Sequence, residues 1–150
     1  MTETNKIKDK TYPGESATPE DLIRLAQEYK KAADAILPLG KSGKPLTRAP
    51  YRLIALHSIE LYLHAFLLIS GCTPKEIRCL QHDFKAKAAL AKEKGLLLRQ
   101  KTQEHIVSLY STREYLTSRY GAEMTTKQSE ITRLKATMEE LAKKVIPKKQ

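Results

Sequence analysis

One long apolar segment, residues 51–70, limits what this chain can fold into more than any other part of the sequence. Its apolar residues fall on almost every side of a helix, which predicts a central helix that is buried nearly all round. His57, Glu60 and His64 interrupt this pattern at positions i, i+3 and i+7, so their side chains share one face. Because an isolated buried charge is costly, we expect this face to be paired with other polar groups or to border a site.

Four further helices are predicted around the apolar segment, and no strand. The sequence Thr-Pro-Glu-Asp at 18–21 is typical of a helix start, and Gly95 is typical of a helix end. The last helix carries a narrow stripe of apolar residues at spacings of three and four, which favours a position outside a bundle or across a partner subunit. The predicted helices cover residues 18–38, 51–70, 83–94, 102–120 and 127–146.

These helices predict a single all-α domain over residues 18–146, an up-and-down bundle of four main helices plus an extra C-terminal helix. Residues 1–17 contain few large apolar side chains and are expected to form a flexible N-terminal arm, with residues 147–150 as a basic tail. We expect residues 40–50 to form a basic loop and residues 71–81 a short polar link.

The charge of the chain indicates the class of its partners. There are 27 Lys and Arg residues against 17 Asp and Glu, a formal net charge of +10, which favours polyanions such as nucleic acid. We find no run of about eighteen apolar residues that would cross a bilayer, and residues 1–16 lack the apolar stretch of a secretory signal. Two cysteines are too few for a disulfide framework. The sequence therefore predicts a cytoplasmic protein without a membrane partner.

Several short motifs resemble those of one protein family. They are the run Ile-Glu-Leu-Tyr-Leu-His-Ala-Phe-Leu at 59–67, Gly71, His82-Asp83-Phe84, Gly95-Leu96, and Arg113 with Arg119-Tyr120 at the end of the fourth helix. Over residues 22–120 the chain resembles the HEPN family, which comprises helical-bundle domains of prokaryotic RNases and of nucleotidyltransferase-associated proteins. His64 stands where the family commonly has a lysine. The resemblance implies a HEPN-like bundle that forms a homodimer.

The same resemblance implies two classes of function. One large branch of the family consists of metal-independent RNases, which carry an arginine and a histidine four to six residues apart. Other branches lack this pair and bind RNA or nucleotides as companions of nucleotidyltransferases. Both an enzyme and a binding module are therefore open, the latter with RNA, a nucleotide or a nucleotidyltransferase-type protein as its partner.

Arg99 and His105 are the candidate catalytic pair, because five residues separate them at the entrance to the predicted fourth helix. In such a pair the histidine would move the proton of the 2′-hydroxyl and the arginine would stabilise charge on the phosphate. Arg52 and His57 have a similar spacing, but they lie at the start of the central helix, which is the wrong place. A pattern this short also arises readily by chance.

A second set of residues is the candidate ligand-binding groove. Its members are Glu60, His64, His82, Asp83, Arg113, Arg119 and Tyr120. Glu60 is expected to pair with Arg113 or Arg119, because a guanidinium satisfies a buried carboxylate with two hydrogen bonds. Asp83 has a structural use too, as the N-cap of the third helix.

The polar face of the central helix also has the residue types of a metal site. His57, Glu60 and His64 offer imidazole and carboxylate ligands, and Cys79 and His82 offer further ones. A polar stripe on a central helix more often forms internal hydrogen bonds or a dimer interface. We therefore predict no metal and no cofactor.

Two main functional hypotheses follow. The first is a non-catalytic, basic, HEPN-like module that binds RNA, a nucleotide or a protein. The alternative is a metal-independent endoribonuclease, of the toxin or defence type, that uses Arg99 and His105. A third hypothesis is a protein-interaction bundle in which the fifth helix is the docking surface.

Overall fold

A computed structural model of the chain describes residues 12–123 and 128–145. In this part of the chain all regular secondary structure is helical, apart from an isolated bridge between Lys41 and Lys44. The α-helices are α2 (Pro19–Ile36), α3 (Ala49–Ile69), α4 (Pro74–Cys79), α5 (Phe84–Glu93), α6 (Gln100–Thr112), α7 (Glu114–Tyr120) and α8 (Ile131–Val145), and the 3₁₀ helices are η1 (Leu37–Leu39) and η2 (Pro45–Arg48). The prediction of an all-α protein is confirmed.

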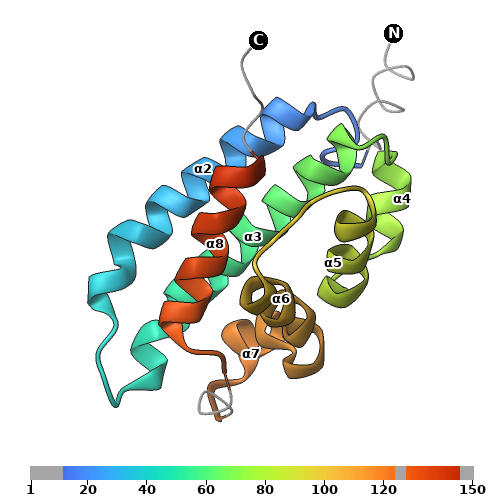
Figure 1. Cartoon of the computed structure of the whole chain (residues 1–150). Helices are drawn as coiled ribbons and strands as arrows, with labels where there is room; N and C mark the ends of the chain where they lie inside the picture. Colours follow the sequence, from blue (N-terminus) through green and yellow to red (C-terminus); the bar gives the residue numbers. More distant parts are fainter. Residues whose placement is uncertain (1–11, 124–127, 146–150) are drawn as a thin grey trace, which may run out of the picture.

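Helix α3 is the centre of the structure, as its apolar sequence predicts. It packs against α2, α8, α7 and α5, and Ile59, Tyr62 and Leu63 are completely buried. Helices α2 and α8 both run along α3, with α2 antiparallel to it, and α5 and α6 pack against each other beside it (Figure 1). The small residue Ala26 lets α2 approach closely, and Ser58 Oγ donates a hydrogen bond to its carbonyl oxygen at 2.9 Å.

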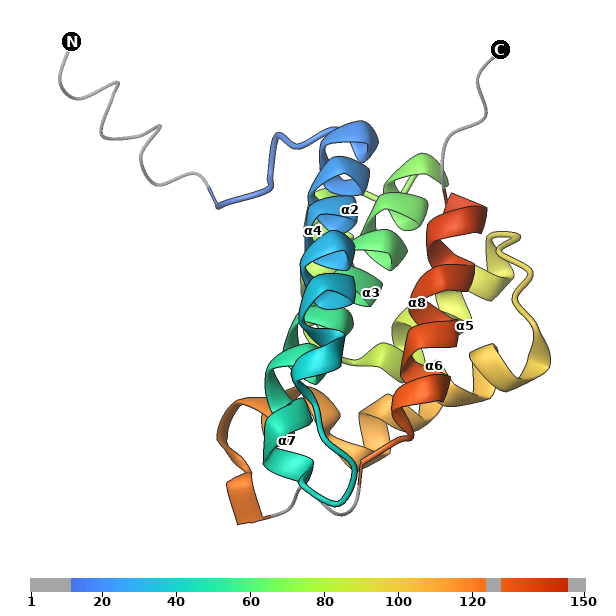
Figure 2. The same cartoon turned by 90° about the vertical axis from the view of Figure 1, so that its left-hand side faces the viewer.

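The C-terminal helix α8 buries the narrow apolar stripe that the sequence shows. Leu134, Met138 and Leu141 are completely buried against the rest of the core, and the helix contacts α3 and α6 (Figure 2). The predicted start of this helix is too early, because residues 128–130 are not helical and α8 begins at Ile131. Residues 127 and 146, the predicted tail 147–150 and most of the predicted arm lie outside the described residues. Helix α8 is therefore an outer helix that covers one side of the core.

The prediction of one continuous fourth helix over residues 102–120 is wrong, because the structure has two helices there, α6 and α7. Arg113 has left-handed backbone angles (φ 50°, ψ 40°) and separates α6 from α7. Just before it, Ser111 Oγ and Thr112 Oγ1 both donate to the carbonyl oxygen of Ser108, at 3.0 and 3.1 Å, and such bonds compete with the helical ladder. The break turns Glu114 into the core, where its carboxylate accepts from Ser129 N at 2.5 Å.

The predicted polar link at 71–81 is also wrong, because it contains the short helix α4. Thr73 Oγ1 accepts from Glu76 N at 3.1 Å, and the Glu76 carboxylate accepts from Thr73 N at 2.8 Å. This capping box satisfies two amide groups that a helix start otherwise leaves unpaired. The same device begins α2, where Thr18 and Asp21 cap each other, and the predicted helix start at Thr18 is confirmed.

The expectation that no segment is apolar enough to cross a membrane needs correction. The segment Pro45–Ile69, which comprises η2 and α3, passes the length and composition test for a spanning helix. However, 56% of its most apolar stretch is buried inside the protein. The core position of α3 is sufficient to explain this composition.

Candidate functional site

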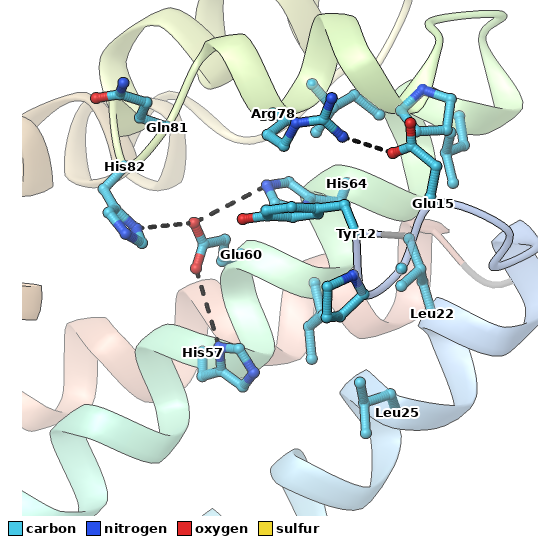
Figure 3. Close-up of a pocket in the computed structure, with 16 residues that line it drawn as sticks. Tyr12, Glu15, Leu22, Leu25, His57, Glu60, His64, Arg78, Gln81 and His82 are labelled. Atoms are coloured by element: carbon cyan, nitrogen blue, oxygen red, sulfur yellow. Dashed lines mark hydrogen bonds and ion pairs between the residues drawn. The ribbon is translucent and has the colours of Figure 1, made fainter. Parts of the chain in front are cut away.

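The candidate site is a groove of about 790 Å³ between α2, α3, α4 and residues 12–15 (Figure 3). Its walls are mainly apolar: Leu22 and Leu25 come from α2, Leu61 and Leu68 from α3, and Ile77 from α4. These positions line the groove because α2 and α4 both lie alongside the same end of α3. The groove therefore has the apolar walls that are usual in small-molecule sites.

Glu60 is the central polar group of the groove, and its main partner is Lys87 of α5. Lys87 Nζ donates to Glu60 Oε2 at 2.7 Å, the short distance of a charge-assisted hydrogen bond. The Lys87 side chain is completely buried, and that of Glu60 is 13% exposed. The expectation that Glu60 pairs with Arg113 or Arg119 is wrong, because both arginines are exposed and Lys87 of α5 supplies the cation instead.

Three histidines surround the Glu60 carboxylate. His82 Nδ1 lies 3.3 Å from Oε2, His64 Nε2 lies 3.9 Å from Oε2, and His57 Nδ1 lies 3.9 Å from Oε1. Figure 3 shows His57 below the carboxylate, with His82 and His64 on either side. Only the His82 distance is short enough for a hydrogen bond. The sequence prediction that His57, Glu60 and His64 share one face of the central helix is confirmed.

The surroundings shift the pKa values of these groups in a consistent direction. Burial raises the pKa of Glu60, but the charge and hydrogen bond of Lys87 and the nearby histidines more than reverse this effect, so the net pKa is below the ordinary value. Burial, with the Lys87 charge, lowers the pKa of His64 to about 4. Burial also lowers the pKa of His57, against the opposing effect of Glu60. At neutral pH the groove thus holds a carboxylate beside two neutral imidazoles.

Aromatic contacts hold two of these imidazoles in place. The ring of Tyr29 meets His57 edge to face, with ring centres 4.6 Å apart. The ring of Tyr115 in α7 stacks on His82 at 4.5 Å. The unpartnered atom is His64 Nε2, which is buried and has no hydrogen-bond partner among the described residues. The His64 ring lines the groove, but this nitrogen is itself buried, 3.9 Å from Glu60 Oε2.

The mouth of the groove carries a second, separate polar contact. Arg78 of α4 pairs with Glu15 at 2.5 Å and lies over the ring of Tyr12, 4.6 Å from its centre (Figure 3). All three residues line the groove. A guanidinium at the mouth and a carboxylate in the depth give the groove two polar ends with apolar walls between them.

No group of three or more His, Cys, Asp or Glu side chains in the described part of the chain is arranged to hold a metal ion. Lys87 Nζ already pairs with Oε2 of Glu60. Cys79 is exposed and is not among the residues that line the groove.

The structure brings together some of the predicted groove residues and separates the others. Glu60, His64 and His82 line the groove, whereas Asp83 is the N-cap of α5, where its Oδ1 accepts from Ala86 N at 2.9 Å. The remaining three predicted residues, Arg113, Arg119 and Tyr120, are exposed on or beside α7 and do not line the groove.

The candidate catalytic pair is not brought together. His105 is 6% exposed, its Nδ1 lies 2.7 Å from Thr137 Oγ1, and neither described groove is lined by it. Burial, with the charges of Arg133 and Arg52, lowers its pKa to about 4. Arg99 is exposed at the N-cap position of α6, and its backbone N–H donates to Glu140 Oε2 at 2.7 Å. The His105 ring is therefore largely shielded from solvent in this structure, whereas Arg99 lies at the surface.

Two groups of site residues were missed in the sequence. Lys87 follows Phe84 by three residues and precedes Ala91 by four, so it occupies the apolar face of α5, and this register was a signal of burial. Tyr12 and Glu15 belong to the segment predicted as a flexible arm. Nothing in the local sequence indicates that they meet Arg78, because that contact depends on the folded arrangement of α2 and α4.

Comparisons of the chain with protein-family models, with curated proteins and with solved structures found no significant match.

Proposed function

We propose that this protein is a non-catalytic, HEPN-like binding module whose groove takes a nucleotide, free or as one residue of an RNA chain. The +10 charge of the chain supports an anionic ligand. The mainly apolar groove of about 790 Å³ has room for a ligand of this size. The HEPN-like arrangement itself is part of the proposal and rests on the motifs at 59–67 and 82–84.

The observation that carries the proposal is the Glu60 carboxylate, which lies beside the neutral imidazoles of His57 and His64 inside apolar walls. Its Oε1 lies 3.9 Å from His57 Nδ1, beyond hydrogen-bond distance, which leaves this oxygen to accept from an amino or ring N–H group of a base. The imidazole of His64 also lines the groove nearby. A planar heterocycle with several N–H and N groups fits this set of donors and acceptors better than a purely apolar ligand does.

Ring faces in the groove support the same class of ligand. His82 and Tyr12 both line it, and base–aromatic stacking is worth roughly 1–3 kcal/mol per base. Because every base has a π-face, stacking of this kind gives affinity with little sequence preference. The proposal therefore predicts binding of several nucleotides with similar affinity.

The test is a calorimetric titration of purified protein with AMP, GMP, CMP and UMP, and with a short single-stranded RNA. We expect the wild type to bind, and Glu60→Gln to weaken binding by about tenfold, which is about 1.4 kcal/mol. The matched control is Glu140→Gln, because Glu140 is also a largely buried carboxylate that accepts from a lysine at 2.7 Å, but it lies on α8 away from the groove. Circular dichroism checks that both variants fold.

Equal weakening by both substitutions would mean that the groove is not the binding site. Absence of any binding to the wild type would remove the nucleotide proposal and leave the protein-interaction hypothesis.

The endoribonuclease alternative is tested by incubating RNA with the protein in EDTA, beside His105→Ala and His57→Ala. We expect no cleavage by the wild type, because His105 is buried against Thr137. Metal-independent cleavage that is lost only in His105→Ala would establish the enzyme and place its site at α6.

The homodimer and a nucleotidyltransferase-type partner protein are carried by the family resemblance alone. Light scattering on the purified protein measures the first directly, with a 17.0 kDa chain as the unit of mass.

A further inference from the structure

Residues 12–15 lie over the mouth of the groove and contribute to its lining. Glu15 Oε2 is 2.5 Å from Arg78 Nη1, and the Arg78 guanidinium lies over the Tyr12 ring. The chain thus places one of its own carboxylates on the one arginine side chain that lines the groove in the described part of the protein.

This contact is weakly held. The side chains of Arg78 and Glu15 are 35% and 36% exposed, and an ion pair between such groups adds little stability. The segment is folded by a turn in which Glu15 N donates to Tyr12 O at 3.0 Å and Ala17 N donates to Gly14 O at 3.1 Å. No residue from 12 to 17 is buried. The segment can therefore leave the groove without opening the core.

Arginine binds a carboxylate and a phosphate with the same planar fork of N–H groups. From these observations we propose that Arg78 is the anion subsite of the groove, that Glu15 fills it in the free protein, and that an anionic group of the ligand displaces Glu15 on binding. The inference rests on the proposed function for the rest of the ligand, whose base is placed at Glu60. The anionic group is a phosphate or a carboxylate.

Occupation of the Arg78 subsite by Glu15 lowers the apparent affinity of the groove for an anionic ligand. Only the fraction of molecules in which Glu15 has left Arg78 can bind the anionic group, and the observed affinity is reduced by that fraction. Removing the Glu15 charge should therefore strengthen binding of an anionic ligand and leave binding of its uncharged counterpart unchanged.

The test compares AMP with adenosine on the wild type, Glu15→Gln, Arg78→Gln and the double variant, by calorimetry. We expect Glu15→Gln to bind AMP about fivefold more tightly than the wild type, and adenosine equally. Arg78→Gln should bind AMP no better than adenosine, and adding Glu15→Gln to it should change nothing. The matched control is Glu20→Gln, an equal change of charge on exposed α2 surface away from the groove lining.

A second arm uses inorganic phosphate and acetate alone, observed by NMR at the Arg78 Nε–H and the Tyr12 ring. If the anions perturb both signals in Glu15→Gln but not in Arg78→Gln, the subsite is supported even if no nucleoside binds. The anion with the larger effect shows whether the subsite prefers a phosphate or a carboxylate. If adenosine binds but Glu15→Gln gives the wild-type affinity for AMP, the subsite is wrong and the groove stands. If Glu20→Gln strengthens AMP binding as much as Glu15→Gln does, or if neither phosphate nor acetate perturbs either signal, the proposal is likewise overturned.

Discussion

Glu60 and Glu114 are both carboxylates that the fold has taken largely out of water, and each faces a buried cation. Glu114 is completely buried, and its carboxylate lies 3.7 Å from Arg52 Nη1 and accepts a hydrogen bond from Ser129 N. Arg52 Nη1 in turn donates to the carbonyl oxygen of Ser129 at 2.5 Å. This network joins α3, the start of α7 and the segment before α8. Glu60 instead meets Lys87 on one side and an open groove on the other.

The difference teaches how to separate a structural ion pair from a candidate site. In the Glu114 network the partners are backbone and side-chain groups of three distant segments, and neither Glu114 nor Arg52 lines a described groove. Around Glu60, the carboxylate and three imidazoles border the same hollow. Similar residue chemistry thus stabilises the fold in one place and is presented to a ligand in the other.

The largest expected effect comes from breaking the structural pair. Glu114→Leu leaves the guanidinium of Arg52, which is 8% exposed, without a counter-charge. We expect a loss of about 3–5 kcal/mol in the free energy of unfolding, measured by urea denaturation. The control Glu28→Leu, at an exposed position, should change it by less than about 0.5 kcal/mol. A Glu114→Leu loss as small as that of the control would mean that the network adds no stability.

Breaking the second pair should cost less and reveal more. Lys87→Met leaves Glu60 unpaired, but this carboxylate keeps His82 at 3.3 Å and some contact with solvent, so we expect a loss of about 2 kcal/mol. The double variant Glu60→Leu/Lys87→Met should regain most of that stability, because no buried charge remains. It should nevertheless lose nucleotide binding. A stable double variant that binds like the wild type would make this pair structural as well.

Substitution of a buried histidine should change the acid dependence of the free energy of unfolding equally in the two regions, but it should change ligand binding only at the groove. The pKa of His64 and that of His105 are both lowered to about 4 in the folded protein, from 6.5. Between pH 6.5 and 4 the unfolded chain therefore binds more protons than the folded one, so stability is complete above pH 6.5 and falls towards pH 4. His64→Gln and His105→Gln should each flatten this fall, by at most about 1.4 kcal/mol per pH unit.

Nucleotide titration at pH 7 separates the two histidines. His64→Gln should weaken binding, because His64 lines the groove, and His105→Gln should leave binding unchanged. Equal effects on binding would contradict the distinction between the regions.

Much of the fold could be predicted from local sequence. The all-round apolar pattern of residues 51–70 places α3 at the centre, and the caps at Thr18 and Asp83 mark two helix starts. Helix α4 was missed although Thr73 and Glu76 form the same capping box as α2, because only six residues follow before the next turn. The break at Arg113 has a local sign in Ser111 and Thr112, whose hydroxyls donate to the carbonyl oxygen of Ser108. The burial of Glu114 against Arg52 and Ser129, by contrast, depends on residues that are distant in sequence.

The candidate site was predictable only in its central part. Glu60 and His64 share a helix face by simple periodicity, and His82 follows the turn after that helix. The burial of Lys87 could not be predicted with the same ease, because its partner lies 27 residues away and an apolar register is the only sign of it. The contact of Arg78 with Glu15 spans 63 residues and needs the packed positions of α2 and α4. Long-range pairing therefore accounts for what sequence reasoning could not supply.

The smallest expected effect tests whether α7 reaches the groove electrostatically although none of its residues lines it. Burial lowers the pKa of His57, Glu60 opposes this, and the positive charge of Arg119 lowers it further. Arg119→Gln should therefore raise the pKa of His57 slightly, towards 6.5, as measured by NMR titration of its ring protons. Because Arg119 is exposed, added salt should screen the difference between variant and wild type. The control is Arg113→Gln, at another exposed arginine beside the other end of α7, and it should leave the pKa of His57 unchanged. An equal shift in both variants would mean that only the net charge of the protein matters.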